Sequence, residues 1–133
     1  PYSSGLGSLD GALSCSVSVD TIFIADELNG QNIDLGTSNM IINKNLVIKT
    51  NAGMSVTVIS NASNPTLTVN NGFTLSMEGI NINGSQSTNA AVVNNGTLNL
   101  KNLNVVQNAS IPLQKNLVNN GALKIEGQCN LSN

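Results

Sequence analysis

The tetrapeptide Val-Asn-Asn-Gly occurs three times in this chain, at residues 69–72, 93–96 and 118–121. Successive copies therefore begin 24 and then 25 positions apart. A repeat of about this length is typical of a solenoid, in which each coil buries its apolar face only by stacking on its neighbours. The repeat constrains the fold strongly, and it says nothing about activity.

The segments that follow the tetrapeptides alternate apolar and polar residues, which is the period of a β-strand and not of a helix. Three of these segments are clear, and a more degenerate one precedes them. Stacking them in register predicts two inward-facing columns. The columns are Leu46, Leu75, Leu98 and Leu123, and beside them Ile48, Met77, Leu100 and Ile125.

Each coil also contains a bend and two further strands. The bend is expected at Thr50, Gly79, Asn102 and Gly127, and the second strands at Val56, Ile80, Leu103 and Cys129. A third strand is expected to end in Val69, Val93 or Val118, and the polar stretches 83–89 and 107–115 are expected to be outward loops. Residues 21–25, 33–35 and 40–42 can form one earlier coil. Three short strands in each coil of roughly 25 residues describe a parallel β-helix.

One outward column carries charges that alternate in sign from coil to coil. Its members are Lys49, Glu78, Lys101 and Glu126. Opposite charges on adjacent strands stabilise the pairing, and each exposed pair contributes only about 0.2–1 kcal/mol. This column therefore favours the proposed register more than it adds stability.

The start of the chain differs from the repeats. Residues 8–13 have a helix N-cap serine and apolar spacing of three and four, which predicts a short amphipathic helix across the open end of the first coil. We therefore expect an N-terminal segment and cap over residues 1–19. A single β-helix domain is expected over residues 20–133, with about four to five coils; the alternative is that this domain is part of a longer solenoid.

Composition excludes several classes of function. Aromatic residues are 2% and charged residues 9% of a chain that is 40% hydrophobic, so the core must be aliphatic. The net charge is −2 and the five lysines are scattered, which argues against nucleic acid as a partner. No apolar run approaches the ~20 residues of a membrane span.

Several motifs resemble right-handed parallel β-helix domains of the pectin-lyase-like superfamily in secreted bacterial surface proteins. They are the cap at residues 8–13, Asp20-Thr21-Ile22, the stretch 30–35 and Asn45-Leu46-Val47-Ile48. The resemblance covers residues 8–131. It implies a right-handed helix and a location outside the cell or on a bacterial surface. Members include polysaccharide-degrading enzymes, adhesins and passive stalks, so the resemblance leaves the function open.

No residue set predicts a catalytic, cofactor or metal site. Asp26-Glu27 is the only adjacent acidic pair, and a solvated turn explains it better than calcium or catalysis does. The threonines fall in different columns, which argues against an ice-binding array. The Asn columns, with Asn71, Asn94 and Asn119 as one and Asn81, Asn104 and Asn130 as the other, are interpreted as structural amide ladders. Phe73, one residue more than the other copies have there, predicts a local bulge.

The expected function is structural or adhesive, as a non-enzymatic stalk or a subunit of an extracellular assembly. The last coil would present an assembly edge made by Leu123, Ile125, Cys129 and Leu131. Its expected partners are further coils of the same protein or neighbouring subunits, with a surface glycan as another. The alternative is a carbohydrate-binding or polysaccharide-degrading β-helix whose site lies elsewhere. Cys15 and Cys129 lie about four coils apart and should not be bonded together, and Cys129 should be a buried thiol.

Overall fold

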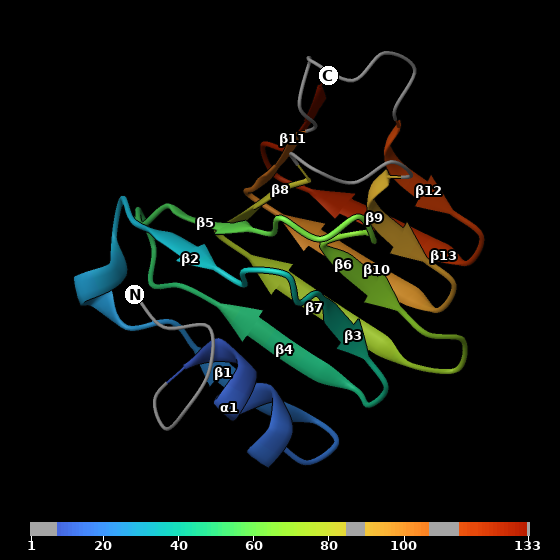
Figure 1. Ribbon diagram of the computed structural model, residues 1–133, viewed down its shortest axis with the longest axis horizontal. Helices are drawn as coiled ribbons and strands as arrows, with labels where there is room; N and C mark the ends of the chain where they lie inside the picture. The colour runs from blue at the N-terminus through green and yellow to red at the C-terminus, as the bar shows by residue number, and fades with distance from the viewer. Residues whose placement is uncertain (1–7, 85–89, 107–114, 133) are drawn as a thin grey trace.

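The computed structural model describes residues 8–84, 90–106 and 115–132. These residues form an all-parallel β-solenoid of about four turns. Strands that lie about 25 residues apart in the sequence are side by side in space, as Figure 1 shows for β4, β7 and β10. The predicted fold class is confirmed. Much of the two predicted loops, at residues 85–89 and 107–114, lies outside the described residues.

Three sheets make up the three sides of the coil. The first sheet contains β1 (Asp20–Phe23), β4 (Leu46–Lys49), β7 (Thr74–Glu78), β10 (Thr97–Lys101) and β13 (Ala122–Glu126). The second contains β2 (Asn32–Asp34), β5 (Val56–Ile59), β8 (Ile80–Asn83), β11 (Asn104–Val106) and β14 (Asn130–Ser132). The third contains β3 (Met40–Ile42), β6 (Leu67–Val69), β9 (Ala90–Asn94) and β12 (Lys115–Asn119).

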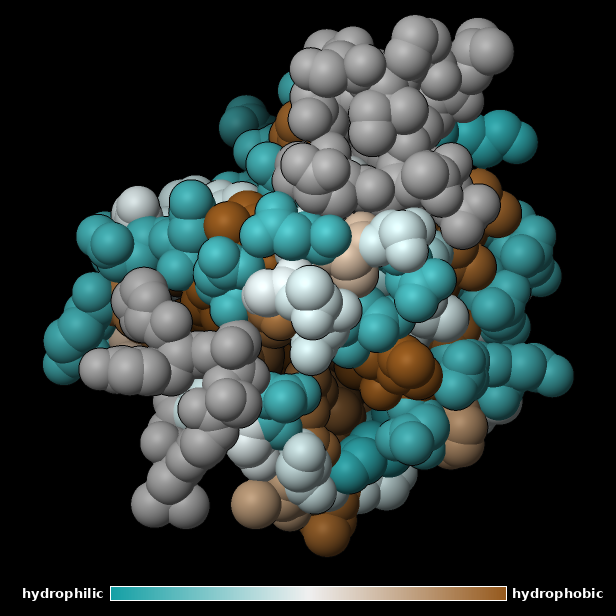
Figure 2. Space-filling view, viewed as in Figure 1, coloured by the Kyte–Doolittle hydropathy of each residue, from teal (hydrophilic) through white to brown (hydrophobic). Residues whose placement is uncertain are grey.

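The register of the first sheet confirms both predicted inward columns. Leu75 pairs with Leu46 and with Leu98, and Leu98 pairs with Leu123. Leu75 and Leu98 are fully buried, so the interior is a narrow aliphatic core. Outside the residues drawn in grey, hydrophilic residues cover much of the face seen in Figure 2, and apolar residues are visible in the hollows between them and in small patches at the surface.

The N-terminal cap is also confirmed. Helix α1 (Leu9–Cys15) begins after Ser8, whose hydroxyl accepts a hydrogen bond from the Gly11 amide at 2.9 Å. Leu9 is buried and Leu13 packs against the core. The helix lies beside β1 at one end of the stack (Figure 1). A short 3-10 helix, η1 (Asp26–Leu28), follows β1 and carries the acidic pair.

The third sheet corrects the predicted register of the tetrapeptides. Val118 pairs with Val93 as expected, but Val69 pairs with Asn94 and not with Val93. Val69 and Asn94 both face the interior, whereas Val93 is half-buried on the opposite face of its strand. The first tetrapeptide is thus shifted by one residue. The turn that follows it has four residues between strand ends, where the next coil has two.

This shift changes the predicted amide ladder. Asn94 is fully buried and its Nδ2 donates to Asn119 Oδ1 at 2.7 Å and to the Ala122 carbonyl at 2.8 Å. Its Oδ1 accepts from the Gly96 amide at 3.1 Å. Asn71 is exposed in the longer turn and does not belong to this column, so that part of the prediction was wrong. The column of Asn81, Asn104 and Asn130 follows the register of the second sheet, in which the Asn104 amide donates to Asn81 Oδ1 at 2.8 Å.

The charged column has the predicted register but only part of the predicted pairing. Lys101 Nζ lies 3.0 Å from Glu78 Oε1, and this contact raises the pKa of Lys101, first through the hydrogen bond and then through the charge. Glu126 instead pairs at 2.9 Å with Lys124 on its own strand, and that hydrogen bond lowers the pKa of Glu126. Lys49 lies over the Phe23 ring, 4.8 Å from its centroid. Of the predicted contacts between adjacent charges in this column, the structure forms the ion pair between Glu78 and Lys101.

Asn94→Ala should lower the free energy of unfolding by about 2 kcal/mol or more, because it removes three hydrogen bonds of a fully buried side chain, and each such bond contributes about 0.5–1.5 kcal/mol. Asn71→Ala is the matched control, since that side chain is exposed and makes no hydrogen bond among the described residues; it should stay within about 0.5 kcal/mol of the parent. Denaturant unfolding measures both. Equal stabilities for the two variants would contradict the buried position of Asn94.

Glu78→Lys should destabilise the fold by up to about 1 kcal/mol at low salt, because it places three lysines in adjacent coils. Lys115→Glu is the control. Lys115 begins β12, and was wrongly expected in a loop, but its exposed side chain lies opposite the uncharged Ala90. Thermal unfolding at low and high salt measures the difference. Identical melting of the two variants at low salt would contradict the electrostatic role of the column.

Candidate functional site

Two features of the surface are candidates for function, and the first is the end of the solenoid formed by β12, β13 and β14. These three strands are the last members of their sheets, so each has one side without a neighbouring strand among the described residues. Ile125 is 45% exposed and Leu131 is 39% exposed. Their counterparts one coil earlier, Leu100 and Val105, are 1% and 0% exposed. The same column positions are thus apolar and uncovered in the last coil.

Leu123 and Cys129 complete the predicted edge, and both are half-buried. Cys129 packs against the core, and its Sγ lies 3.4 Å from the Glu126 carbonyl oxygen. The prediction of a buried thiol was wrong, because a position in an inward column is covered only when another coil lies over it. Both cysteines are free, as expected.

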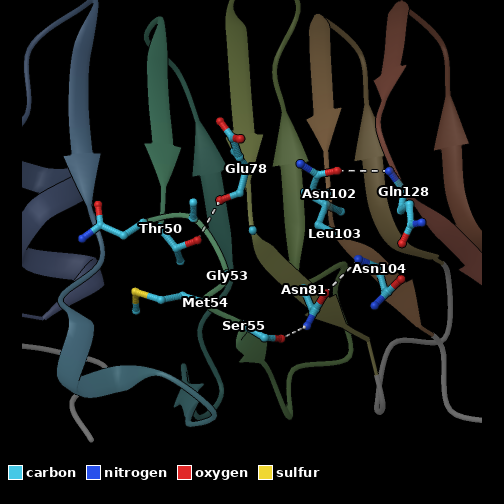
Figure 3. Close-up of a pocket in the computed structure, with 13 residues that line it drawn as sticks. Thr50, Gly53, Met54, Ser55, Glu78, Asn81, Asn102, Leu103, Asn104 and Gln128 are labelled. Carbon is cyan, nitrogen blue, oxygen red and sulfur yellow. Dashed lines mark hydrogen bonds between the residues drawn. The ribbon is translucent and has the colours of Figure 1, made fainter.

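The second candidate is a polar groove of about 420 Å³ at the corner between the first and second sheets. It exists because the corner turns differ in length. Six residues join β4 to β5, whereas Gly79 alone joins β7 to β8. All six residues of the longer turn line the groove together with Gly79. Asn102 and Gln128 continue the corner in the next two coils (Figure 3).

In the corner column, residues with a polar side chain alternate with glycines. The column consists of Thr50, Gly79, Asn102 and Gly127. Gly79, Asn102 and Gly127 have positive φ values of 74°, 50° and 66°, which confirms the predicted bends. A Cβ built on Gly79 would overlap Thr50 Oγ1, and one on Gly127 would overlap Asn102 Oδ1. Asn102 Oδ1 also accepts a hydrogen bond from the Gln128 amide at 3.1 Å. Each polar side chain therefore fills the space above the next glycine, which sequence reasoning from bend propensity alone missed.

The groove offers hydrogen bonds and no reactive group. Asn81 is engaged, because its Nδ2 donates to Ser55 Oγ at 2.9 Å and its Oδ1 accepts from Asn104 N. The side-chain amides of Asn104 and Gln128 are exposed and make no hydrogen bond to other described residues. Glu78 is the only carboxylate that lines the groove, and it is paired with Lys101. This arrangement suits a neutral polar ligand.

Neither residue of the acidic pair lines this groove, although Asp26 contacts Asn51, which does. Asp26 Oδ1 accepts a hydrogen bond from Asn51 Nδ2 at 2.7 Å, and Glu27 lines a different cavity, between α1 and the first coil. No group of three or more metal-binding side chains is present in the part of the chain that the structure describes. Over the same residues, no helix has the length and apolar character needed to cross a membrane.

Comparison with other proteins adds no assignment to this geometry. No family model matches the chain, and neither a curated protein nor a solved structure matches it significantly.

Gly79→Ala should destabilise more than Gly72→Ala. Both glycines have positive φ, so both pay about 1–2 kcal/mol of backbone strain, but only at Gly79 does the new methyl meet a neighbour. The additional cost should be about 1–3 kcal/mol, as for other overpacked sites. Thr50→Ala should recover part of that addition in the double variant. Denaturant unfolding of Gly72→Ala, Gly79→Ala, Thr50→Ala and the double variant measures the coupling. Strictly additive changes in the free energy of unfolding for Gly79→Ala and Thr50→Ala would contradict the contact.

Proposed function

We propose that this chain is a non-enzymatic structural module of an extracellular bacterial assembly, which gains length by stacking a further parallel β-coil on β12, β13 and β14. The contrast in exposure between the last coil and its predecessor carries the proposal. Aliphatic side chains are fully covered in one coil, and their aliphatic counterparts in the next coil are open. An unpaired strand edge with such side chains recruits another strand unless it is covered.

The two ends of the solenoid support a direction for this stacking. The first coil is covered by α1, with Leu9 buried against the core. The last coil has no such helix among the described residues. Terminal coils of solenoids require caps, so the uncapped end is the one that is suited to an added coil.

The pectin-lyase-like resemblance is consistent with a stalk or adhesin on a cell surface. The resemblance rests on the cap and the early coil motifs, so it supports the location and the architecture of the proposal. It does not identify a ligand.

Adding a coil tests this function. A chain extended after Asn133 by a second copy of residues 109–133 should be more stable by at least about 2 kcal/mol, since full burial of one Leu or Ile contributes about 1.5–3 kcal/mol. Amide hydrogen exchange of residues 123–131 should slow to the level of the central coils. A scrambled extension of equal composition is the control. A matched extension in which lysine replaces the copied glutamate of position 126 should be more stable still, because it continues the charge alternation.

The proposal fails if the true extension melts no higher than the scrambled one. It also fails if the unmodified chain is monomeric at high concentration while its last-coil amides already exchange as slowly as those of the central coils.

Carbohydrate binding is a second candidate, and the corner groove favours it. Asn104 and Gln128 present free amides, and amides can donate and accept hydrogen bonds to sugar hydroxyls. Titration with neutral oligosaccharides, followed by amide chemical shifts, tests it. Shift changes confined to the groove residues would support this function, and an unchanged spectrum would exclude it for those sugars.

A further inference from the structure

The chain contains five Asn-Gly dipeptides, and the structure distinguishes their chemical environments sharply. They begin at Asn29, Asn71, Asn83, Asn95 and Asn120. In such a dipeptide the glycine amide nitrogen can attack the Asn side-chain carbon. A new C–N bond closes a succinimide ring, the C–NH₂ bond breaks and ammonia leaves; water then opens the ring to aspartate or isoaspartate. The reaction needs no cofactor, and it requires a free glycine amide and a mobile Asn side chain.

Hydrogen bonds hold the glycine amide at three of the five sites. Gly30 N donates to the Ser55 carbonyl at 2.8 Å, and Gly84 N donates to the Val106 carbonyl at 3.0 Å. Gly96 N donates to Asn94 Oδ1 at 3.1 Å. Each amide must lose this partner before its nitrogen can attack, so the reaction at these sites depends on local opening of the fold.

The Asn side chain is also held at two of these sites. Asn29 Oδ1 accepts from the Ser55 amide at 3.0 Å, and Asn95 Oδ1 accepts from Asn120 Nδ2 at 2.9 Å. The latter contact restrains Asn120 as well. Gly121 N has no hydrogen bond among the described residues, but Gly121 lies against the Gly96 carbonyl, so that corner is closely packed.

Asn71-Gly72 combines two features that the other four sites do not combine among the described residues. Within the described residues, neither its side chain nor the Gly72 amide makes a hydrogen bond. Both residues are exposed, and a Cβ built on Gly72 meets nothing within 4 Å. Among the described residues, the backbone hydrogen bond that closes this turn is from Phe73 N to the Asn70 carbonyl at 3.2 Å. The register shift that lengthens the turn is what removes Asn71 from the ladder.

We propose that Asn71-Gly72 is a site of spontaneous deamidation in the folded protein, and that coil stacking protects the other four Asn-Gly corners. Conversion at Asn71 adds a negative charge, and in the isoaspartate product it reroutes the backbone through the side-chain carbon. The next coil packs against Asn70 and Phe73, but Asn71 and Gly72 are exposed and the space beside Gly72 is open, so the fold tolerates the change. The same conversion at Asn120 would remove a contact between two coils, because a carboxylate cannot donate the hydrogen bond that Asn120 Nδ2 gives to Asn95 Oδ1.

The test is incubation of the whole chain in mildly alkaline buffer, with the deamidated peptides quantified over time by mass spectrometry. Asn71 should convert at least about tenfold faster than Asn29, Asn83 and Asn95, which corresponds to about 1.4 kcal/mol of opening free energy. Asn120 should fall between these groups. In denaturant the five rates should converge, because each site then has the same reacting pair without structure.

Two variants complete the experiment. Asn71→Ala should remove the fast phase and leave the other four rates unchanged, and Asn70→Ala, which alters the neighbouring amide only, should keep the fast phase. The proposal is overturned if another Asn-Gly site is fastest in the native chain. It is equally overturned if the order of rates is the same with and without denaturant, since the fold would then protect nothing.

Discussion

Every part of this structure depends on backbone hydrogen bonds between equivalent strands of successive coils. Those bonds fix the spacing of the coils, so each side chain meets the residue at the same position in the next coil. The constraint explains why the core is made of stacked Leu, Ile, Val and Met, and why the corners use side chains that fit one above another. It also explains why the last coil differs from the others, since aliphatic side chains of one column are covered or exposed according to what lies over them.

Much of the fold was predictable from the sequence. Alternation of period two fixed the strands that begin near Leu75, Leu98 and Leu123, and their equal spacing fixed the columns. The cap was predictable because its signals are local in the sequence: Ser8 is an N-cap residue, and the leucines that follow it have the spacing of one apolar helix face. The function was not predictable to the same degree, because the same solenoid carries many activities.

The register of the third sheet was not predictable from the tetrapeptide. The copies have the same sequence, but Val69 faces the interior and Val93 does not. The deciding factor is the interior position, which Val69 fills with a methyl-rich side chain and Asn94 fills with an amide whose hydrogen bonds are satisfied. Phe73 indicated an irregular turn. The expected difference was a single inserted residue, whereas the turn between β6 and β7 is two residues longer than the turn between β9 and β10. The corner groove and the exposed Asn71 follow from turn lengths that only the three-dimensional register defines.

Hydrogen-bond scalar couplings between coils, measured by NMR, test this account most directly. In the observed register the Asn95 amide donates to the Val69 carbonyl at 2.8 Å, and the Asn120 amide donates to the Asn94 carbonyl at 2.8 Å. The account predicts a coupling from Asn95 nitrogen to the carbonyl carbon of Val69. A coupling to the carbonyl carbon of Asn70 would mean that the tetrapeptides pair in register, with Val69 beside Val93. That result would contradict the buried position of Asn94, on which the ladder depends.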